Sequence, residues 1–269
     1  MSIDRIAVML RKYGLIPLSI LFILFVLPNG MVRCEDQISL QLAWRHQFQF
    51  AGYYAARHKG FYQQAGLEVS LVEGGEGRFA REELINGNAQ YGVAGSELLL
   101  HRAEGDPFVV LAPIFQHSPS ILLSKKSSGI SSMQGLIGKR VMLLPGKKDA
   151  DILAAFLNEG VPIGAIRRID QTYNLEDLIE GRTDAVSAYL TNEPWHLLRQ
   201  GIEPMIISPQ TYGVDFYADC LFTTEQEIST HPERVNAFLS ASLKGWAYAM
   251  DHPEEMVDLI RQQYRVEKS

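Results

Sequence analysis

Short runs typical of β-strands alternate with helical patterns along most of this chain, and this alternation restricts the fold to a few layered α/β arrangements. Ile38 to Trp44 alternates apolar and polar residues, as a first strand does. Phe50 to Gln64 has apolar residues at helical spacing, and Leu67 to Val72 is typical of a second strand. Such strand, helix, strand crossovers predict parallel pairing, with a crevice at the carboxyl ends of the strands.

The same alternation continues to the end of the chain and divides into two units. We expect strands at 91–94, 108–114, 120–124, 141–144, 165–169, 185–189, 204–207 and 216–223, and helices at 78–86, 96–104, 131–136, 149–159, 174–180, 193–200, 232–252 and 253–264. Gly129 and Gly213 flank the second unit and are the expected crossing points. The predicted division is residues 35–128 for lobe I, 129–213 for lobe II and 214–269 for a return to lobe I.

The first 34 residues have the layout of a signal peptide. Arg5, Arg11 and Lys12 precede an apolar run from 15 to 27, and Cys34 ends a tolerable cleavage site. That run of thirteen residues is short of the roughly 20 that span a bilayer. We therefore expect cleavage before residue 35 and a periplasmic protein, with an uncleaved N-terminal anchor as the alternative.

Charge and cysteine content argue against several classes of function. The chain has 25 lysines and arginines against 31 acidic residues, a formal net charge of -6, and four of the basic residues lie in the first 34. This acidity argues against nucleic acid and anionic membranes as partners. Membrane contact is expected only through a partner or an uncleaved leader. Because Cys220 is the one cysteine outside the leader, neither a disulfide framework nor a zinc cluster is expected.

Eight short motifs follow one another in a recognisable order. They are LAWRHQF at 42–48, GYYAA at 52–56, KGFY at 59–62, AGLEV at 65–69, YGVA at 91–94, LIGKRV at 136–141, GRTDA at 181–185 and YLTNEP at 189–194. Over residues 38–264 the chain resembles the periplasmic solute-binding proteins related to thiamine-pyrimidine synthase. The resemblance implies a type II periplasmic-binding-protein fold, an α/β chain in two lobes with mixed, mainly parallel sheets around a central cleft.

The resemblance also implies a function and its partners. Family members bind aminopyrimidines, sulfonates and similar solutes, so we expect a small planar nitrogenous ligand, similar to a thiamine-pyrimidine precursor, captured by hinge closure. The partner implied is an ABC-type permease, or a downstream kinase or cyclase domain, because the opening WRHQFQF at 44–50 is most similar to sensor ectodomains. No catalysis and no cofactor is expected.

The alternative is the pyrimidine-forming synthase itself, which uses pyridoxal phosphate on a lysine and consumes a histidine. The family's lysine position falls in the run Tyr91 to Ala94, which has no lysine. His101 matches the consumed histidine only loosely. The enzyme's cysteine-rich segment would fall near Cys220, and one thiol does not build that site. Binding is therefore the favoured interpretation.

Candidate ligand-binding residues follow the strands of lobe I. They are Trp44, His46, Phe48, Tyr53, Glu73, Ser96 and Glu97. A flat indole at the end of a strand can stack on a planar ring, although the alternation that includes Leu40 also allows a core tryptophan. The glycine-rich turn after Glu73 is interpreted as lining the crevice. Ser96 either holds a polar ligand edge or simply caps its helix.

The candidates of lobe II are Thr191, Asn192 and Glu193, with Asp219 as a weaker candidate near the return crossing. A partly buried carboxylate at Glu193 could accept paired hydrogen bonds from an aminopyrimidine, or Asn192 and Glu193 could only cap a helix. The turn with Lys147 and Lys148 could bind an anion at a helix start, but we favour two solvated lysines. No metal site is expected.

Overall fold

A computed structural model of the chain describes residues 36–264. The predicted signal peptide and its cleavage site therefore lie outside the described residues. Within that range, none of the helices is long and apolar enough to cross a membrane.

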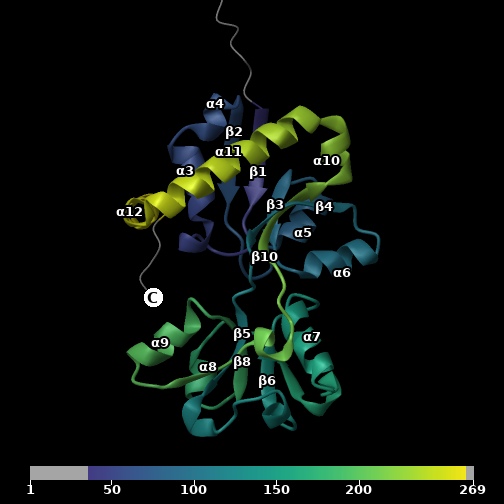
Figure 1. The fold of residues 1–269 in the computed structure, drawn as a ribbon, viewed down its shortest axis with the longest axis vertical. Coiled ribbons are helices and arrows are strands. Elements are labelled where there is room, and N and C mark those ends of the chain that lie inside the picture. The colour runs from purple at the N-terminus through teal and green to yellow at the C-terminus, as the bar shows by residue number, and fades with distance from the viewer. Residues whose placement is uncertain (1–35, 265–269) are drawn as a thin grey trace, which may run out of the picture. The chain divides into compact units, whose positions relative to one another are not determined.

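The described chain contains two five-stranded sheets, and most of their strands are labelled in Figure 1. The first sheet has the order β2-β1-β3-β10-β4, and the second has the order β7-β6-β8-β5-β9. The strands of the first sheet are β1 (Asp36–Gln41), β2 (Leu67–Val72), β3 (Tyr91–Ala94), β4 (Phe108–Phe115) and β10 (Ala218–Thr224). Those of the second are β5 (Ser120–Lys125), β6 (Arg140–Leu143), β7 (Arg167–Asp170), β8 (Ala185–Tyr189) and β9 (Pro204–Ile207).

The two sheets have the same topology. In the first, β1 runs parallel to β2 and β3, and β10 is antiparallel to both β3 and β4. In the second, β6 runs parallel to β7 and β8, and β5 is antiparallel to both β8 and β9. Four strands of each sheet thus share one direction, and the fifth is antiparallel and comes from the other half of the chain. This confirms the prediction of a two-lobed fold with mixed, mainly parallel sheets.

The chain changes sheets at two segments, residues 116–119 between β4 and β5 and residues 208–217 between β9 and β10. These crossing segments are bonded to each other. The amide of Ser118 donates to the carbonyl of Phe216 at 2.8 Å, and His117 Nδ1 lies 2.9 Å from Asp215 Oδ2. Residues 120–124 were expected in lobe I, with the crossing at Gly129, but β5 is hydrogen bonded within the second sheet, so the chain crosses before residue 120.

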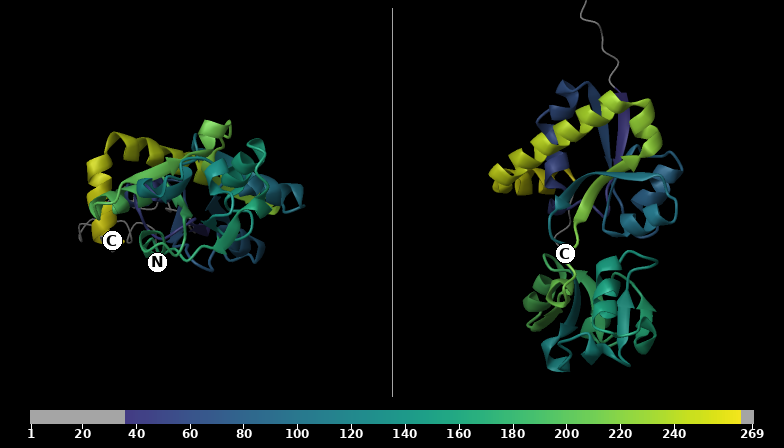
Figure 2. Two further views of the ribbon diagram at one scale, coloured as in Figure 1. Left: turned by 90° about the horizontal axis from the view of Figure 1, so that it is seen from below. Right: turned by 45° about the vertical axis from the view of Figure 1, so that its right-hand side comes forward.

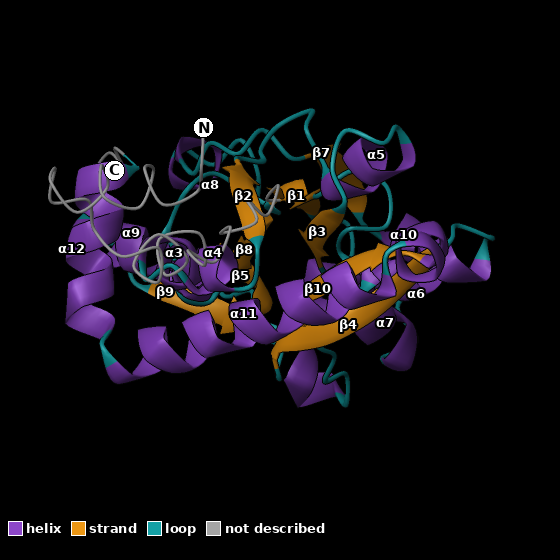
Figure 3. Ribbon diagram, turned by 90° about the horizontal axis from the view of Figure 1, so that it is seen from above, coloured by secondary structure: helices purple, strands orange, loops and turns teal. Residues whose placement is uncertain are grey.

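Helices connect the strands and cover the sheets, as the further views in Figure 2 show. They are η1 (Phe48–Phe50), α3 (Ala51–His58), α4 (Phe61–Gln64), α5 (Ala80–Ile85), α6 (Glu97–Ala103), η2 (Lys126–Ser128), η3 (Gln134–Leu136), α7 (Ala150–Asn158), η4 (Ile163–Ala165), α8 (Glu176–Ile179), α9 (Glu193–Arg199), η5 (Pro209–Tyr212), α10 (Glu225–Thr230), α11 (Pro232–Asp251) and α12 (Pro253–Gln263). Figure 3 shows the bend at which α11 ends and α12 begins. A proline is the first residue of each of these two helices, where its missing amide costs nothing.

Two of the differences from the predicted boundaries matter for the site. Strand β1 ends at Gln41, so Trp44 lies in the loop beyond the strand rather than on it. The helix predicted from Phe50 to Gln64 is two helices, α3 and α4, because Gly60 adopts φ 73 between them. Only glycine takes that left-handed conformation without steric cost, so the chain turns there.

The core of the first sheet is closed by α11 and α3. The ring of Phe238 in α11 stacks on Tyr91 of β3 at 3.9 Å and on Tyr62 of α4 at 5.2 Å between centroids. All three rings are buried, and each contributes roughly 2–3 kcal/mol through removal from water. The C-terminal helices are therefore part of the first lobe's core, as the resemblance implies.

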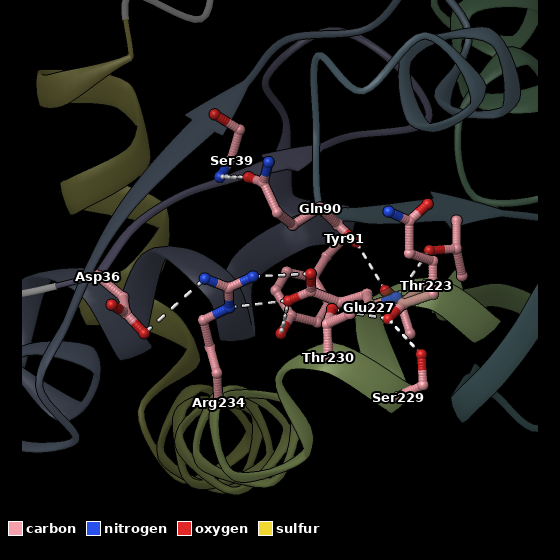
Figure 4. A network of polar contacts seen from close by, with 11 residues as sticks. Asp36, Ser39, Gln90, Tyr91, Thr223, Glu227, Ser229, Thr230 and Arg234 are labelled. Atoms are coloured by element: carbon pink, nitrogen blue, oxygen red, sulfur yellow. Dashed lines mark hydrogen bonds and ion pairs between the residues drawn. The ribbon is translucent and has the colours of Figure 1, made fainter.

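A polar network joins α10 and α11 to this sheet (Figure 4). Arg234 donates two hydrogen bonds to the carboxylate of Glu227, at 2.8 and 2.7 Å. Tyr91 donates its hydroxyl hydrogen to Glu227 Oε1 at 3.1 Å, and Thr224 accepts the amide of Glu227 as the cap of α10. Because both charges of the ion pair are shielded from water, each depends on the other.

Candidate functional site

The loop after β1 presents Trp44 to the second half of the chain. Its half-buried indole lies 4.8 Å, between ring centroids, from the phenol of Tyr173, which follows β7. The turn after β2 holds the loop, because Gly74 donates its amide to the carbonyl of Trp44 at 3.0 Å. A Cβ at Gly74 would lie 2.3 Å from the carbonyl oxygen of Leu42, so only glycine fits. Gly74 therefore lets this turn approach the Trp44 loop closely. The turn was predicted to line the crevice, whereas the close approach at Gly74 is to the protein's own backbone.

Glu73 and His46 belong to the same arrangement. The carboxylate of Glu73 accepts the amide of His46 at 2.7 Å, on the exposed side of the turn. The ring of His46 points toward α3 and α12, with Nδ1 3.0 Å from the Tyr54 hydroxyl and the ring 4.6 Å from that of Tyr264. Burial lowers the pKa of His46, and the nearby Glu73 partly opposes that effect. His46 therefore packs against α3 and α12 of its own lobe.

Phe48 and Tyr53, two further predicted residues, also lie away from the Trp44 pair. Phe48 is 45% exposed, in η1. Tyr53 is fully buried in α3, with its ring 5.5 Å from that of Trp246 in an edge-to-face arrangement. Among the described residues its hydroxyl has no hydrogen-bond partner. Burial raises the pKa of that phenol, and the negative charge of Asp219 adds to the increase.

Asp219 joins side chains from both halves of the chain. It is the second residue of β10, is 2% exposed and has φ 45, in the left-handed region. Gln49 of η1 donates to its Oδ2 at 2.9 Å, and the hydroxyl of Tyr189, at the end of β8, lies 3.5 Å from its Oδ1. Burial raises the pKa of Asp219 to about 7, against the hydrogen bond from Gln49 and together with the charge of Glu97.

Two contacts thus join the two sheets, Trp44 with Tyr173 and Asp219 with Gln49 and Tyr189, and these five residues are here called the junction cluster. Trp44 and Gln49 are five residues apart in the segment that follows β1, so this segment contributes to both contacts, a tilted aromatic pair and a buried carboxylate. Burial raises the pKa of Tyr189 strongly, and the charge of Asp219 is the next largest cause. The Tyr189 hydroxyl therefore stays protonated and can donate a hydrogen bond.

Ser96 and Glu97 lie at the start of α6. Ser96 occupies the N-cap position, but its side chain makes no capping bond. The Glu97 side chain folds back over Gly95, where a Cβ would lie 2.5 Å from Glu97 Oε2. Burial raises the pKa of Glu97, and the charge of Lys148 opposes that effect. The charge of Glu97 raises the pKa values of Asp219 and Tyr189.

The segment Thr191 to Glu193 is used mainly within the second lobe. Thr191 and Asn192 are exposed. Glu193 Oε2 accepts the amide of Tyr189 at 2.8 Å, and its Oε1 accepts Asn192 Nδ2 at 2.8 Å. The Glu193 carboxylate therefore binds the backbone at the end of β8, at Tyr189. It is the side chain of Tyr189, rather than Thr191 to Glu193, that contacts Asp219.

The turn with two lysines contacts the first lobe. Lys148 Nζ lies 3.1 Å from the centre of the Phe79 ring, and burial lowers the pKa of this lysine. Lys147 forms an ion pair with Glu104. The prediction of two solvated lysines was wrong, because residues 145–149 pack against first-lobe residues that sequence spacing does not place nearby.

Two further carboxylates, Asp149 and Asp151, lie at the start of α7. Asp149 accepts the amide of Leu144 and the hydroxyl of Ser187, both at 2.6 Å, and burial raises its pKa to about 7. Asp151 accepts the hydroxyl of Ser118 at 2.6 Å. In the part of the chain that the structure describes, no group of three or more acidic, histidine or cysteine residues could hold a metal ion.

Sequence reasoning missed Gln49, Tyr173 and Tyr189. Tyr189 is the first residue of the motif at 189–194 and ends a predicted strand, so its position was an available signal. Tyr173 has φ 58, which is uncommon outside glycine, and nothing in the sequence indicates it. Gln49 is identified only by its partner, because Asp219 is 170 residues away.

Comparison with known proteins identifies the family. Residues 47–256 match the model described as NMT1/THI5 like. The chain belongs to the NMT1/THI5-like family. The match covers both sheets apart from β1, including Asp219 and the crossing segments.

Three relatives that match most of this chain differ in their names. A riboflavin-binding protein of Chloroflexus aurantiacus is 27% identical, over 87% of this chain and 68% of the relative. A 4-amino-5-hydroxymethyl-2-methylpyrimidine phosphate synthase of Legionella pneumophila is 26% identical, over 87% and 75%. A formylaminopyrimidine-binding protein of Halalkalibacterium halodurans is 22% identical, over 84% and 70%.

Solved structures show the same fold. The periplasmic aliphatic sulphonate binding protein of Escherichia coli superposes with a TM-score of 0.65, covering 84% of this chain and 78% of its own, at 17% identity. This structural similarity supports the two-lobed arrangement. The relatives named as binding proteins support solute binding as the general function of this chain.

Proposed function

We propose that the chain is an exported solute-binding protein that captures a small planar nitrogen-containing ligand by closing its two lobes. The observation that carries this proposal is the contact between Trp44 and Tyr173, one aromatic ring from each lobe, at 4.8 Å. Aromatic faces attract planar rings and cations. A flat heterocycle entering the junction cluster takes over this contact and holds both lobes at once.

The hinge of this closure is the pair of crossing segments. Residues 116–119 and 208–217 are bonded to each other through Ser118 and Phe216, and through His117 and Asp215. Two linked connecting segments of this kind concentrate rotation in a few residues, as hinge motions require. In this proposal Thr191 to Glu193 support closure by holding the backbone of Tyr189.

Titration calorimetry tests the proposal with riboflavin and 4-amino-5-hydroxymethyl-2-methylpyrimidine as probes. We expect micromolar or tighter binding of at least one probe, and a loss of at least about tenfold in Trp44→Ala from lost stacking of ~1.5 kcal/mol. Trp44→Phe should retain part of the affinity. Trp195→Ala is the matched control, because Trp195 is 53% exposed on α9. Equal affinity of wild type and Trp44→Ala for every bound probe would remove the basis of the proposal.

Export and delivery are separate parts of the proposal. The relative of known structure is named as periplasmic, and the first 34 residues have a signal peptide's layout. N-terminal sequencing of the protein from a secreting host should give Glu35 as the first residue, whereas an anchor would keep Met1.

The delivery partner is an ABC-type permease or a kinase or cyclase domain, and co-purification with a neighbouring permease would favour uptake.

The synthase reaction has one observation in its favour, since Lys148 is a partly buried lysine of lowered pKa and such amines form imines readily. The remaining residues do not fit pyridoxal phosphate. Strand β3, where the family's lysine is expected, has no amine, and Lys148 Nζ lies against the Phe79 ring. Cys220 is buried with its pKa raised to about 11, so it stays a thiol. Borohydride trapping with pyridoxal phosphate should give no adduct specific to Lys148.

A further inference from the structure

The carboxylate of Asp219 has less hydrogen bonding than its burial requires. Its Oδ2 has a full hydrogen bond from Gln49 at 2.9 Å, whereas the contact of Oδ1 with the Tyr189 hydroxyl is 3.5 Å, at the outer limit of a hydrogen bond. The residue is 2% exposed. Buried carboxylates of this kind are normally satisfied by several donors, because each missing bond costs free energy.

The backbone of Asp219 supports a functional role for the side chain. Its φ of 45 lies in the left-handed region, which costs an L-residue other than glycine of order 1 kcal/mol, and such residues cluster at ligand sites. This conformation is what brings the Asp219 carboxylate to Gln49 from the first lobe and Tyr189 from the second. Aspartate and asparagine tolerate the conformation better than most residues.

The groups around Asp219 are neutral donors and one further acid. Tyr53 of α3 and Tyr189 of β8 lie close enough for the Asp219 charge to raise the pKa of each phenol. Glu97 of α6 raises the pKa of Asp219 by its charge, and Asp219 in turn raises that of the adjacent Cys220 thiol. The charge of Lys148 lowers the pKa of Glu97, and no lysine is among the causes that shift the pKa of Asp219. An anionic ligand group would face two carboxylates here.

We propose that Asp219 is the specificity-determining residue of the junction cluster: its Oδ1 accepts a hydrogen bond from an N–H group of the ligand. The site then selects heterocycles with an amino or ring N–H group and rejects compounds whose polar end is a sulfonate. The inference rests on the proposed function and adds the chemical class of ligand. It also separates this chain from its sulfonate-binding structural neighbour, which is similar only in fold.

The test compares three variants with wild type in titration calorimetry. The variants are Asp219→Asn, which keeps shape and tolerates φ 45, Trp44→Ala for the stacking contact, and Asp251→Asn as a control aspartate exposed at the end of α11. The probes are riboflavin, 4-amino-5-hydroxymethyl-2-methylpyrimidine and butanesulfonate. Circular dichroism melts establish that each variant is folded before titration.

We expect wild type and Asp251→Asn to bind a heterocycle and not butanesulfonate. Asp219→Asn should bind the heterocycle about 10- to 100-fold more weakly, the usual loss for a hydrogen bond to a charged group. Affinity of wild type should fall as the pH is lowered from 8 to 6, because protonation weakens the Asp219 acceptor, and that dependence should be absent from Asp219→Asn. A role of Asp219 in folding alone would not produce the pH dependence.

Each contrary result has a separate meaning. If Trp44→Ala loses heterocycle binding while Asp219→Asn stays within twofold of wild type, the role of Asp219 is wrong and the proposed function stands. Tighter binding of butanesulfonate than of both heterocycles by wild type also overturns the role of Asp219. Failure of wild type to bind any of the three probes overturns the proposed function.

Discussion

Gly245 of α11 lies directly against Gly52 of α3: a Cβ on Gly245 would lie 2.1 Å from the carbonyl oxygen of Gly52. The same close approach brings Trp246 over Gly52, where a Cβ would lie 2.2 Å from the indole. Helix α11 thus packs on α3 through two glycines. This contact fixes α3, which follows the Trp44 loop in the chain.

Gly245→Ala should therefore destabilise the protein. The added methyl meets a backbone atom, which cannot move aside as a flexible side chain can, so a loss of about 3 kcal/mol or more is expected. Urea unfolding followed by circular dichroism measures it. Gly164→Ala is the matched control, because a Cβ there meets nothing within 4 Å, and its effect should stay within about 0.5 kcal/mol. Equal midpoints for the two variants would contradict the helix contact.

The ion pair of Arg234 with Glu227 should contribute far more to stability than a surface pair nearby. Arg234→Met leaves the Glu227 charge buried without its partner, so we expect a loss of about 3–5 kcal/mol. Arg102→Met removes the exposed pair with Glu225 on the same helix α10 and should cost less than about 1 kcal/mol. Chemical unfolding of both variants gives the difference, and similar losses would show that the network of Figure 4 is not shielded from water.

Asp149 should make the protein less stable as the pH rises toward neutrality. Its folded pKa is about 7 against 3.8 for the free group, so the native state holds a proton that the unfolded state has lost. The resulting stability is fully present below pH 4 and is lost as the pH rises through 7, at about 1.4 kcal/mol per unit in the limit. The difference in unfolding free energy between wild type and Asp149→Asn should fall with pH over that range. A constant difference would mean that Asp149 titrates normally.

Contact between the lobes should depend on Lys148. Lys148→Ala removes a cation from the face of Phe79, an interaction worth roughly 0.5–2 kcal/mol. Hydrogen exchange of amides in residues 74–80 should therefore become faster. Lys139→Ala, an exposed lysine of the second lobe, should leave those amides unchanged. Equal exchange rates in the two variants would indicate that the Lys148 contact does not hold the lobes together.

The candidate site was predicted only in part, and the reason is distance along the chain. Trp44 was selected because it follows a strand, and it does lie between the sheets. Its partner Tyr173 and the partners of Asp219 come from other elements, and pairing across 170 residues leaves no local pattern. His46, Tyr53 and Glu193 have polar or aromatic side chains in suitable positions, but their contacts are with their own lobe.

The sequence alone determined the layered α/β class, the positions of most strands and helices, and the family, because periodicity and motifs are local properties of the chain. It predicted the return of β10 to the first lobe but not the place of β5 in the second sheet, since strand exchange depends on hydrogen bonds between distant segments. The junction cluster is likewise a product of tertiary structure. Only when the two crossing segments bring the sheets together do Trp44 and Asp219 acquire the neighbours and the burial on which their proposed roles depend.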